Sequence, residues 1–436
     1  MDRRRVVITG MGAVTPIGNN VRETWRGLLE GRSGIGKISI FDASGFPTQI
    51  AGEIKGFDFS KWPEKDESLC LLGRNSHFAL EAASEAMKDS GVENARIPKN
   101  RIGVYFGAGD GGFDFPEYAS IISESLNGGS SVKMKDYRDK SLKRLTPKSV
   151  LEQEPYQTVN HLARVFQAQG TVSNCLTACA ASSQAIGEAA EIIRRGDADV
   201  MITGGTHSMI HPLGVAGFNL LTALSVRNDD PARASRPFDK GRDGFVLSEG
   251  SGVIILEELE RAKKRGAKIY AEFAGYGATA DAFRLTDPHP DGKGAVQAMR
   301  LSLEDALVSI DGIDYINAHG TSTPYNDLAE TRAIKEIFGK RAYQIPISST
   351  KSMIGHTIGA ASGISAVIST LVIKHGVIPP TINLENPDPQ CDLDYVPNKS
   401  RNVEINTAMS NSFGFGSNNA VLIFRKYEKK HQAGIE

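Results

Sequence analysis

Short apolar runs that fit buried strands alternate with helix-like stretches along this chain, and the alternation starts a second time after residue 266. The strand-like runs lie at 5–10, 101–106, 171–176, 200–203 and 245–257, and then at 267–278, 314–318, 347–349 and 420–424. Helical spacing of apolar residues marks 24–30, 75–90 and 180–195, and then 294–307, 328–338 and 359–375. Such alternation is typical of helices layered on sheets. The sequence therefore predicts an α/β fold.

The length of the chain supports a division into two halves. A chain of 436 residues exceeds the size at which a single hydrophobic core usually stops growing. A basic turn that ends in glycine, KKRG at 263–266, separates the two rounds of strands and helices. We predict two pseudo-duplicated halves, residues 1–265 and residues 266–436.

Cys179 lies where the strand-like run 171–176 gives way to the helix-like stretch 180–195. The unpaired N–H groups and the positive dipole end of a helix N-terminus stabilise a thiolate, so this position predicts a thiol with a lowered pKa. A free cysteine is also among the residue types most often simply buried. Position alone therefore leaves both a catalytic and a structural role open for Cys179.

Charge and cysteine content exclude several classes of function and location. The net charge is −1, which argues against nucleic acid as a partner, because binding phosphates requires clustered cations. Four cysteines in so long a chain favour a reducing compartment, and no stretch approaches the length of a membrane span, so we expect a cytoplasmic protein. Cys175 and Cys179 have a spacing found in metal sites, but no His/Cys pair at finger-like spacing accompanies them, and we expect no metal.

Two polar stretches of the second half contain candidate histidines. Residues 317–324, NAHGTSTP, place His319 at the end of a predicted strand, where ligands often bind in α/β folds. Residues 348–357, SSTKSMIGHT, contain Lys351 and His356 just before an apolar helix. Each histidine alone also fits a structural role.

A third stretch, NSFGFGSNN at 411–419, has glycines that allow backbone N–H groups to approach a ligand closely, although a glycine-rich loop alone is only a turn. Lys351 and Glu330 also fit a simple ion pair. Together with Cys179, the three stretches form a candidate catalytic set.

Four motifs in a fixed order make a family resemblance specific. They are TACAAS at 177–182, NAHGTSTPYND at 317–327, SSTKSMIGHTIGAASG at 348–363 and NSFGFGSNNA at 411–420. With them the chain resembles the β-ketoacyl-acyl carrier protein synthases, the condensing enzymes of the thiolase-like superfamily, and it is most similar to the synthase II type. The similarity runs from about Arg4 to Phe424 and is weakest between Asp110 and Gln153.

The resemblance implies a five-layered α-β-α-β-α fold with two similar halves. It implies that Cys179 accepts an acyl chain as a thioester and that His319 and His356 are the two active-site histidines. Two histidine N–H donors would stabilise the enolate that forms when a malonyl thioester loses CO2. The resemblance also implies supporting roles: Lys351 and Glu330 as a charged pair, the N–H of Phe415 in an oxyanion hole beside an acyl gate, and Thr321, Thr323 and Phe413 in binding the substrate and its pantetheine arm.

The implied activity is that of a β-ketoacyl-acyl carrier protein synthase in fatty acid biosynthesis. Such an enzyme condenses an acyl thioester with malonyl-acyl carrier protein. The carrier protein would bring the phosphopantetheine, so we expect no cofactor of the chain's own, and the resemblance implies a homodimer. The alternatives are a ketosynthase of a type II polyketide or polyene pathway, a non-catalytic chain-length subunit, a cysteine hydrolase, and a heterodimer with a ketosynthase-like subunit. Chain-length subunits usually lack the active-site cysteine, so Cys179 argues against that alternative.

Three stretches depart from the family pattern. Ser417 replaces a glycine in the third motif, which predicts a stiffer loop around Phe415. The segment 110–153 is longer and more basic than in the family, and we expect a solvated surface excursion there, with a docking surface or a lid as the alternative. Residues 68–72, SLCLL, are apolar where family members often carry basic residues that dock the acidic carrier protein.

Overall fold

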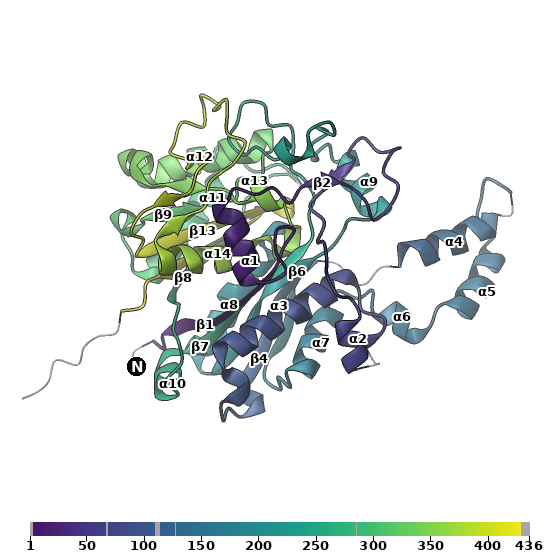
Figure 1. The fold of residues 1–436 in the computed structure, drawn as a ribbon, viewed down its shortest axis with the longest axis horizontal. Coiled ribbons are helices and arrows are strands. Elements are labelled where there is room, and N and C mark those ends of the chain that lie inside the picture. The colour runs from purple at the N-terminus through teal and green to yellow at the C-terminus, as the bar shows by residue number, and fades with distance from the viewer. Residues whose placement is uncertain (1–2, 67–68, 110–113, 127, 285, 429–436) are drawn as a thin grey trace, which may run out of the picture.

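The fold is built from a large sheet with helices on both faces and between its two halves (Figure 1). The computed structural model describes residues 3–66, 69–109, 114–126, 128–284 and 286–428. The strands are β1 Val6–Val14, β2 Gly36–Lys37, β3 Ile50–Ala51, β4 Ile102–Ala108, β5 Val172–Cys175, β6 Val200–His207, β7 Gly250–Glu258, β8 Ala271–Ala280, β9 Tyr315–Asn317, β10 Ile347–Ser348, β11 Val377–Ile378, β12 Arg401–Asn402, β13 Thr407–Gly414 and β14 Asn418–Arg425. The helices are α1 Val21–Leu29, α2 Lys61–Lys65, α3 Arg74–Ser90, α4 Phe115–Leu126, α5 Met134–Arg144, α6 Pro147–Leu151, α7 Gln157–Val165, α8 Ala181–Arg195, α9 Pro212–Leu220, α10 Leu259–Lys264, α11 Lys293–Ala306, α12 Pro324–Phe338, α13 Lys351–Ile354 and α14 Ala361–His375.

The strand order shows the same five-strand pattern twice. The order is β10-β9-β13-β14-β8-β1-β7-β6-β4-β5. Counted outward from the centre, β1, β7, β6, β4 and β5 repeat the order and the parallel or antiparallel pairing of β8, β14, β13, β9 and β10. The two sets are joined where Val6–Ile8 pair antiparallel with Ala271–Phe273. The predicted α/β fold with two similar halves is therefore confirmed, while the division at residue 265 stays a prediction.

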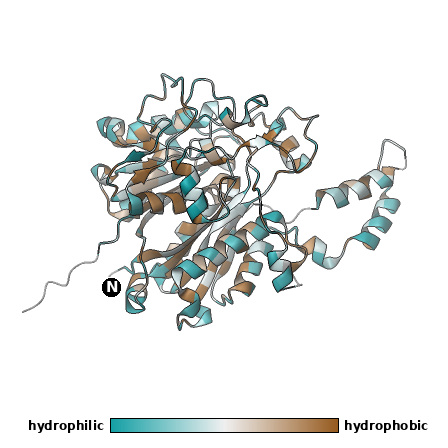
Figure 2. Ribbon diagram, in the orientation of Figure 1, coloured by the Kyte–Doolittle hydropathy of each residue, from teal (hydrophilic) through white to brown (hydrophobic). Residues whose placement is uncertain are grey.

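Two helices, α8 and α14, form the middle layer. Each of them contacts strands of both five-strand sets, and they also contact one another. On the outer faces, α3 packs on β1 and β7, and α11 packs on β8 and β14 with α12 beside it. Figure 2 shows hydrophobic residues concentrated on the strands and hydrophilic residues on the outward faces of the outer helices. The five-layered arrangement follows from these contacts.

Helix α14 is unusually apolar because it is enclosed by protein. The stretch Ile358–His375 is long and apolar enough to cross a membrane by length and composition alone, which the sequence analysis did not anticipate, but 89% of it is buried inside the molecule. Its close approach to the sheet depends on glycine, since a Cβ at Gly252 of β7 would lie 2.3 Å from the backbone nitrogen of Ile364. The apolar sequence of α14 is thus explained by the core that it fills.

Residues 114–126 and 128–153 form a helical arm that extends away from the sheet (Figure 1). Residues 110–113 and 127 of the segment 110–153 lie outside the described residues, as does Ser68 of the SLCLL stretch. Helices α4 and α5 pack as a hairpin, in which Arg144 pairs with Glu117 and Glu124 at 2.7 and 2.8 Å. Arg138, Lys140 and Arg144 of the basic run therefore pair with acidic side chains of the arm itself.

Residues 411–419 differ from the prediction, because the sequence predicts a loop there and the structure has two strands joined by a turn. Residues 411–414 end strand β13, a tight turn occupies Phe415–Ser417, and β14 follows at once. The strand was missed because buried polar residues interrupt its apolar pattern, among them Ser410, Asn411 and Ser412. Asn411 Nδ2 donates to a Glu330 carboxylate oxygen at 3.0 Å, and Ser412 Oγ lies 2.6 Å from Ser362 Oγ.

Candidate active site

Cys179 lies on a tight helical turn, Ala178–Ala180, that joins β5 to α8. The regular helix begins at Ala181, just after the cysteine, and Cys179 is 3% exposed. The residue before it, Ala178, has a φ of +47°, a left-handed conformation that non-glycine residues rarely adopt. Backbone strain of this kind is concentrated at functional sites, because the surrounding structure must hold it in place.

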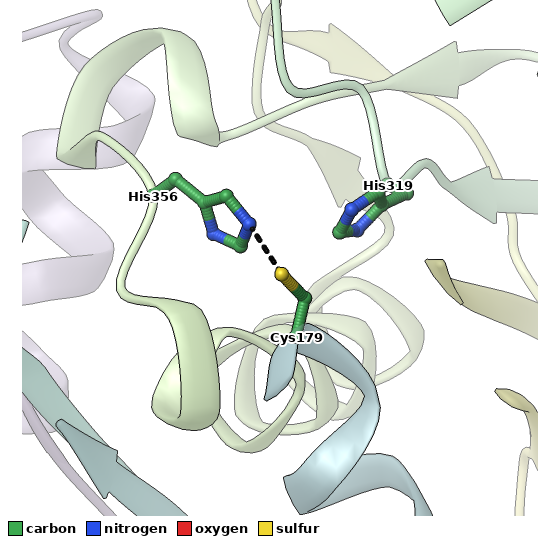
Figure 3. Close-up of side chains that lie close together, drawn as sticks. All are labelled: Cys179, His319 and His356. Atoms are coloured by element: carbon green, nitrogen blue, oxygen red, sulfur yellow. Dashed lines mark hydrogen bonds between the residues drawn. The ribbon is translucent and has the colours of Figure 1, made fainter. Parts of the chain in front are cut away.

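Two histidine side chains from the second half lie beside the sulfur of Cys179 (Figure 3). The Nε2 of His356 is 3.1 Å from the Cys179 Sγ. The rings of His319 and His356 lie 5.3 Å apart at 83°, and the ring of Phe413 packs on His319 at 5.9 Å. The structure therefore brings together Cys179, His319 and His356 from two halves of the chain.

A backbone N–H determines the tautomer of His356. The N–H of Ile358 donates to the His356 Nδ1 at 3.2 Å, so this nitrogen carries a lone pair and no proton. In a neutral imidazole the proton then resides on Nε2, and the Nε2–H donates toward the Cys179 Sγ. Ile358 has a φ of +41°, so a second strained residue holds this contact.

Burial shifts the pKa of Cys179 in the direction opposite to the one predicted from the sequence. The helix N-terminus predicts a lowered pKa, but loss of water around the thiolate raises the pKa of Cys179 to about 11. The backbone N–H groups of Phe415 and of Cys179 itself, together with the charge of Lys351, act in the lowering direction. The predicted lowering of the pKa is wrong for the resting protein, because removing a charged sulfur from water costs more than the helix N-terminus offsets.

Both histidines are held in the neutral form. Burial lowers the pKa of His319 and the pKa of His356 well below the ordinary value, and the positive charge of Lys351 acts in the same direction. Two neutral imidazoles next to a sulfur are hydrogen-bond donors to a developing negative charge without themselves adding charge.

Glu330 and Lys351 are both buried but do not form the direct ion pair that the sequence suggested, since no contact within 4.0 Å joins them among the described residues. The Glu330 carboxylate accepts hydrogen bonds from the N–H groups of His319 and Gly320, both at 2.8 Å, and from Asn411 Nδ2 at 3.0 Å. Burial lowers the pKa of Lys351 to about 8, while the charge of Glu330 raises it. Glu330 thus holds the backbone of the His319 loop, and its influence on Lys351 acts at longer range.

Buried hydroxyl groups that the sequence analysis did not identify also support the cysteine. Ser362 Oγ donates to the carbonyl oxygen of Cys179 at 3.0 Å and lies 2.6 Å from Ser412 Oγ, which Ser183 Oγ contacts at 3.1 Å. This chain of hydroxyls links α14, β13 and α8 to the cysteine turn. Serines in apolar helices give no distinctive sequence signal, which explains why they were missed.

The turn after β13 places Phe415 beside the cysteine. Gly414, which precedes Phe415, packs closely on the turn that carries Cys179. A Cβ on Gly414 would lie 3.1 Å from the backbone nitrogen of Cys179. Ser417 has a φ of +67°, a conformation that glycine adopts at least cost, so the residue that replaces glycine there is strained. The predicted stiffening of the loop stays a prediction. Ser417 Oγ donates to the carbonyl oxygen of Arg284 at 3.0 Å.

A cavity of about 310 Å³ leads from the surface to Cys179, His319 and His356. Thr321, Thr323 and Phe413 all line it, as does Phe415. The hydroxyls of Thr321 and Thr323 lie 2.9 Å apart, and Thr323 also caps the N-terminus of α12. The cavity therefore gives a ligand access to the sulfur.

The same three residues offer metal-ligating atoms within 4.8 Å of one another. A metal bound at the His356 Nε2 would require the ring proton to move to Nδ1, where it would face the N–H of Ile358. Two N–H groups directed at each other repel, so the second shell opposes metal ligation. The set fits hydrogen-bond donation to a sulfur or an oxygen better than it fits a cation.

Known proteins match this chain over nearly its whole length. A family model described as "Beta-ketoacyl synthase, N-terminal domain" matches residues 3–262, and one described as "Beta-ketoacyl synthase, C-terminal domain" matches residues 270–385. A protein of Synechocystis sp. named 3-oxoacyl-(acyl-carrier-protein) synthase 2 is 47% identical over 428 residues, covering 98% of this chain and 99% of the relative. A protein of the same name from Staphylococcus aureus is 45% identical over 427 residues, with coverage of 98% and 99%.

Solved structures with the same fold include a beta-ketoacyl synthase and a ketosynthase of a type II polyketide synthase. A beta-ketoacyl synthase of Burkholderia phymatum is 36% identical with a TM-score of 0.86, covering 98% of this chain and 100% of that chain. The solved complex of a type II polyketide synthase acyl-carrier protein with its ketosynthase is 35% identical with a TM-score of 0.84 and the same coverage.

Proposed function

This chain belongs to the beta-ketoacyl synthase family, and we propose that it is a 3-oxoacyl-acyl carrier protein synthase of fatty acid elongation. The reaction is the condensation of an acyl thioester, held on Cys179, with malonyl-acyl carrier protein. One observation carries the assignment: a buried cysteine from one half of the chain lies at the end of a cavity between two neutral histidines from the other half.

Acyl transfer to Cys179 is the first step. The sulfur attacks the thioester carbonyl of the incoming acyl group, the carbonyl oxygen becomes an oxyanion, and the bond to the pantetheine sulfur breaks. The cysteine proton is transferred, in net terms, to that leaving sulfur. The N–H groups of Phe415 and Cys179, which converge near Sγ, are the donors that would stabilise the oxyanion.

Formation of the carbanion is the second step. The malonyl carboxylate leaves as CO2, and the electron pair of the broken carbon–carbon bond forms an enolate on the remaining thioester. The Nε2–H of His356 and an N–H of His319 stabilise the enolate oxygen. The enolate carbon then attacks the acyl carbonyl on Cys179 to form the new carbon–carbon bond, and the tetrahedral intermediate collapses with loss of the Cys179 thiolate. The thiolate takes a proton from solvent, which restores the resting thiol.

Lys351 and Glu330 position and tune the two histidines in this proposal. The charge of Lys351 disfavours protonation of both imidazoles, so they stay donors that add no charge of their own. Glu330 orders the loop that carries His319 through two backbone N–H groups. Neither residue needs to touch the substrate.

The partner and the setting of the enzyme belong to the same proposal. Phosphopantetheine would enter on an acyl carrier protein, along Thr321 and Thr323, and the enzyme would need no cofactor of its own. We propose that the enzyme is cytoplasmic, because four cysteines in so long a chain favour a reducing compartment, and that it is a homodimer, as the family resemblance implies. The similarity to a polyketide ketosynthase and the long helical arm favour a polyketide or polyene pathway as the second candidate, with the same chemistry.

Product analysis tests the proposed function. The enzyme is incubated with an octanoyl-loaded and a malonyl-loaded acyl carrier protein, and the carrier-bound product and the released CO2 are quantified. We expect a 3-oxodecanoyl thioester and CO2 in equal amounts. Release of free octanoic acid without CO2 would indicate a hydrolase and contradict the proposal.

A further inference from the structure

The turns that precede the two helices of the middle layer carry the same short sequence. Residues 177–182 read TACAAS and residues 357–362 read TIGAAS, with the same residue at four of six positions. The first turn leads into α8 and the second into α14, and both helices are 15 residues long and end at a left-handed glycine. The second residue of each turn is strained in the same way, with a φ of +47° at Ala178 and +41° at Ile358. The two turns are therefore equivalent elements of the two halves.

The serines that end these two motifs form a reciprocal pair of hydrogen bonds. Ser182 Oγ donates to the carbonyl oxygen of Gly359, and Ser362 Oγ donates to the carbonyl oxygen of Cys179 at 3.0 Å. Gly359 and Cys179 are each the third residue of their motif, so each serine bonds the equivalent residue of the opposite turn. Both serines are buried. We call the two hydrogen bonds the serine ties.

Strand β6 encloses the first tie. A Cβ at Gly205 of β6 would lie 2.4 Å from Ser182 Oγ and 2.6 Å from the carbonyl oxygen of Gly359. A side chain at this position would occupy the space of the hydrogen bond itself, so glycine is required there. The close packing of β6 keeps the hydroxyl of Ser182 directed at the carbonyl oxygen.

Strand β13 supports the second tie with a hydrogen bond. Ser412 and Gly205 are each the sixth of eight residues in strands that lie third from the centre of the sheet. Ser412 Oγ lies 2.6 Å from Ser362 Oγ. A carbonyl oxygen only accepts, so the single hydroxyl proton of Ser362 goes to Cys179, and Ser412 donates to Ser362. Ser183 Oγ donates to Ser412 in turn, and hydroxyls in series polarise one another, which strengthens the bond to the Cys179 carbonyl.

The ties lie close in sequence to the two side chains that must meet. Cys179 lies three residues before Ser182, and His356 lies three residues before Gly359. The Nε2 of His356 and the Sγ of Cys179 are 3.1 Å apart (Figure 3). A displacement of about 1 Å between reacting groups costs on the order of 100-fold in rate. A small shift of one turn against the other would therefore impair the site.

We propose that Ser182 and Ser362 are positioning residues, whose ties hold the two turns in register and keep Cys179 at the correct distance from His356. The inference rests on the proposed function, which assigns the reaction to those two side chains. Neither serine is among the residues that line the cavity, so both act through the turns and not on the substrate. Strained residues persist only where the surrounding structure holds them, and each tie supplies that hold from the opposite half of the chain.

Single substitutions test each tie. The formation of 3-oxodecanoyl-carrier product is measured at saturating octanoyl-loaded acyl carrier protein, with the malonyl-loaded carrier varied. We expect Ser182→Ala and Ser362→Ala each to lower kcat by about 10- to 100-fold. The KM for the malonyl-loaded carrier should change less than about threefold, because neither serine lines the cavity. A kcat within about twofold of the wild type in either variant, or a loss confined to KM, overturns the proposal.

Ser302→Ala is the matched control. Ser302 is a buried serine of α11, and its Oγ donates to the carbonyl oxygen of Met299 at 2.8 Å, away from the site. All three substitutions delete one buried hydrogen bond from a hydroxyl to a carbonyl group. Each rate is divided by the folded fraction from far-ultraviolet circular dichroism, and we expect the kcat of Ser302→Ala to stay within about twofold of the wild type. An equal loss of kcat in all three variants would indicate general destabilisation and overturn the proposal.

The double variant tests whether the two ties act together. Both ties span the same junction, so the loss of one lets the turns shift and removes most of the benefit of the other. We expect the kcat of Ser182→Ala/Ser362→Ala to lie within about threefold of the slower single variant. A loss equal to the product of the two single losses would show that the serines act independently, which contradicts reciprocal ties. If the double variant does not fold, the two single variants decide the proposal.

The wild-type enzyme separates this proposal from the proposed function. If the wild type forms no 3-oxodecanoyl product, the proposed function fails. If the wild type condenses the two thioesters and Ser182→Ala and Ser362→Ala do so at the same rate, only the positioning proposal fails.

Discussion

At the scale of single residues, the site combines a nucleophile that is costly to ionise with donors that reduce the cost. Burial raises the pKa of Cys179 to about 11 even though two backbone N–H groups and the charge of Lys351 favour the thiolate. The Nε2–H of His356, oriented by the N–H of Ile358, is a further donor at 3.1 Å from Sγ. These donors would stabilise an oxyanion or an enolate more strongly than they stabilise the resting thiol, because negative charge develops only during the reaction.

The pH dependence of alkylation tests the state of the resting thiol. Because the pKa of Cys179 is raised, the sulfur is protonated at neutral pH, and the thiolate fraction increases about tenfold per pH unit below about 11. We expect the rate of iodoacetamide labelling, followed by intact mass, to rise continuously from pH 7 to pH 10. The rate for a small free thiol is the control. A labelling rate that is already constant between pH 7 and pH 8 would show a lowered pKa and contradict this description.

Removal of either histidine separates the two half-reactions. We expect His319→Ala and His356→Ala still to accept an acyl group on Cys179, while the rate of malonyl decarboxylation falls by about 100- to 1,000-fold, the usual cost of one lost oxyanion donor. Carbon dioxide release from malonyl-carrier protein is the measurement. His375→Ala is the control, since His375 stacks on Trp25 outside the cavity. Normal CO2 release in both site variants would exclude the enolate-stabilising role.

At the scale of elements, strands and helices with regular apolar patterns were predictable, and polar strands were not. The helix at 75–90 corresponds to α3 at Arg74–Ser90, because its alanine stripe faces the sheet. Strand β13 was taken for a loop, since buried Asn411 and Ser412 carry site contacts in place of apolar side chains. Cys179, His319 and His356 could be predicted from their motifs, whereas the tautomer of His356 and the raised pKa of Cys179 depend on contacts that only the folded chain forms.

The contact between β7 and α14 gives a prediction about stability. A Cβ at Gly252 would lie 2.3 Å from the backbone nitrogen of Ile364, and backbone on both sides leaves no side chain to move away. We expect Gly252→Ala to lower the free energy of unfolding by about 1–3 kcal/mol, the usual cost of overpacking a core. Denaturant unfolding measures it.

Gly217→Ala is the matched control for that measurement. Gly217 lies in α9, and a Cβ there meets no atom within 4 Å. We expect this variant to be as stable as the wild type or more stable by about 0.5–1 kcal/mol, because alanine restricts the unfolded chain. Equal effects of the two substitutions on the free energy of unfolding would show that the contact of β7 with α14 has room for a side chain at position 252.

At the scale of the whole molecule, the site exists only where the two halves meet. Helices α8 and α14 come from different halves, and each packs on strands of both. The cysteine lies just before α8, and His356 lies shortly before α14, so the packing of these two helices sets the distance between them. Neither half contains a complete catalytic set.

This shared middle layer predicts cooperative unfolding. Because α8 and α14 bury surface against both halves, we expect thermal unfolding to occur in one transition, with far-ultraviolet circular dichroism and tryptophan fluorescence giving coincident curves. Trp25 and Trp62 pack against different core clusters, so the fluorescence samples more than one region. Two separated transitions would show that the halves are independent domains.

The central claim is that Cys179 holds the acyl chain during condensation, and intact mass spectrometry tests it most directly. Wild-type enzyme and Cys179→Ala are incubated with octanoyl-loaded acyl carrier protein and weighed without further treatment. The proposed mechanism predicts one octanoyl group on the wild-type chain and none on Cys179→Ala, with peptide mapping that places the label on Cys179. An octanoyl group that persists on Cys179→Ala would contradict it.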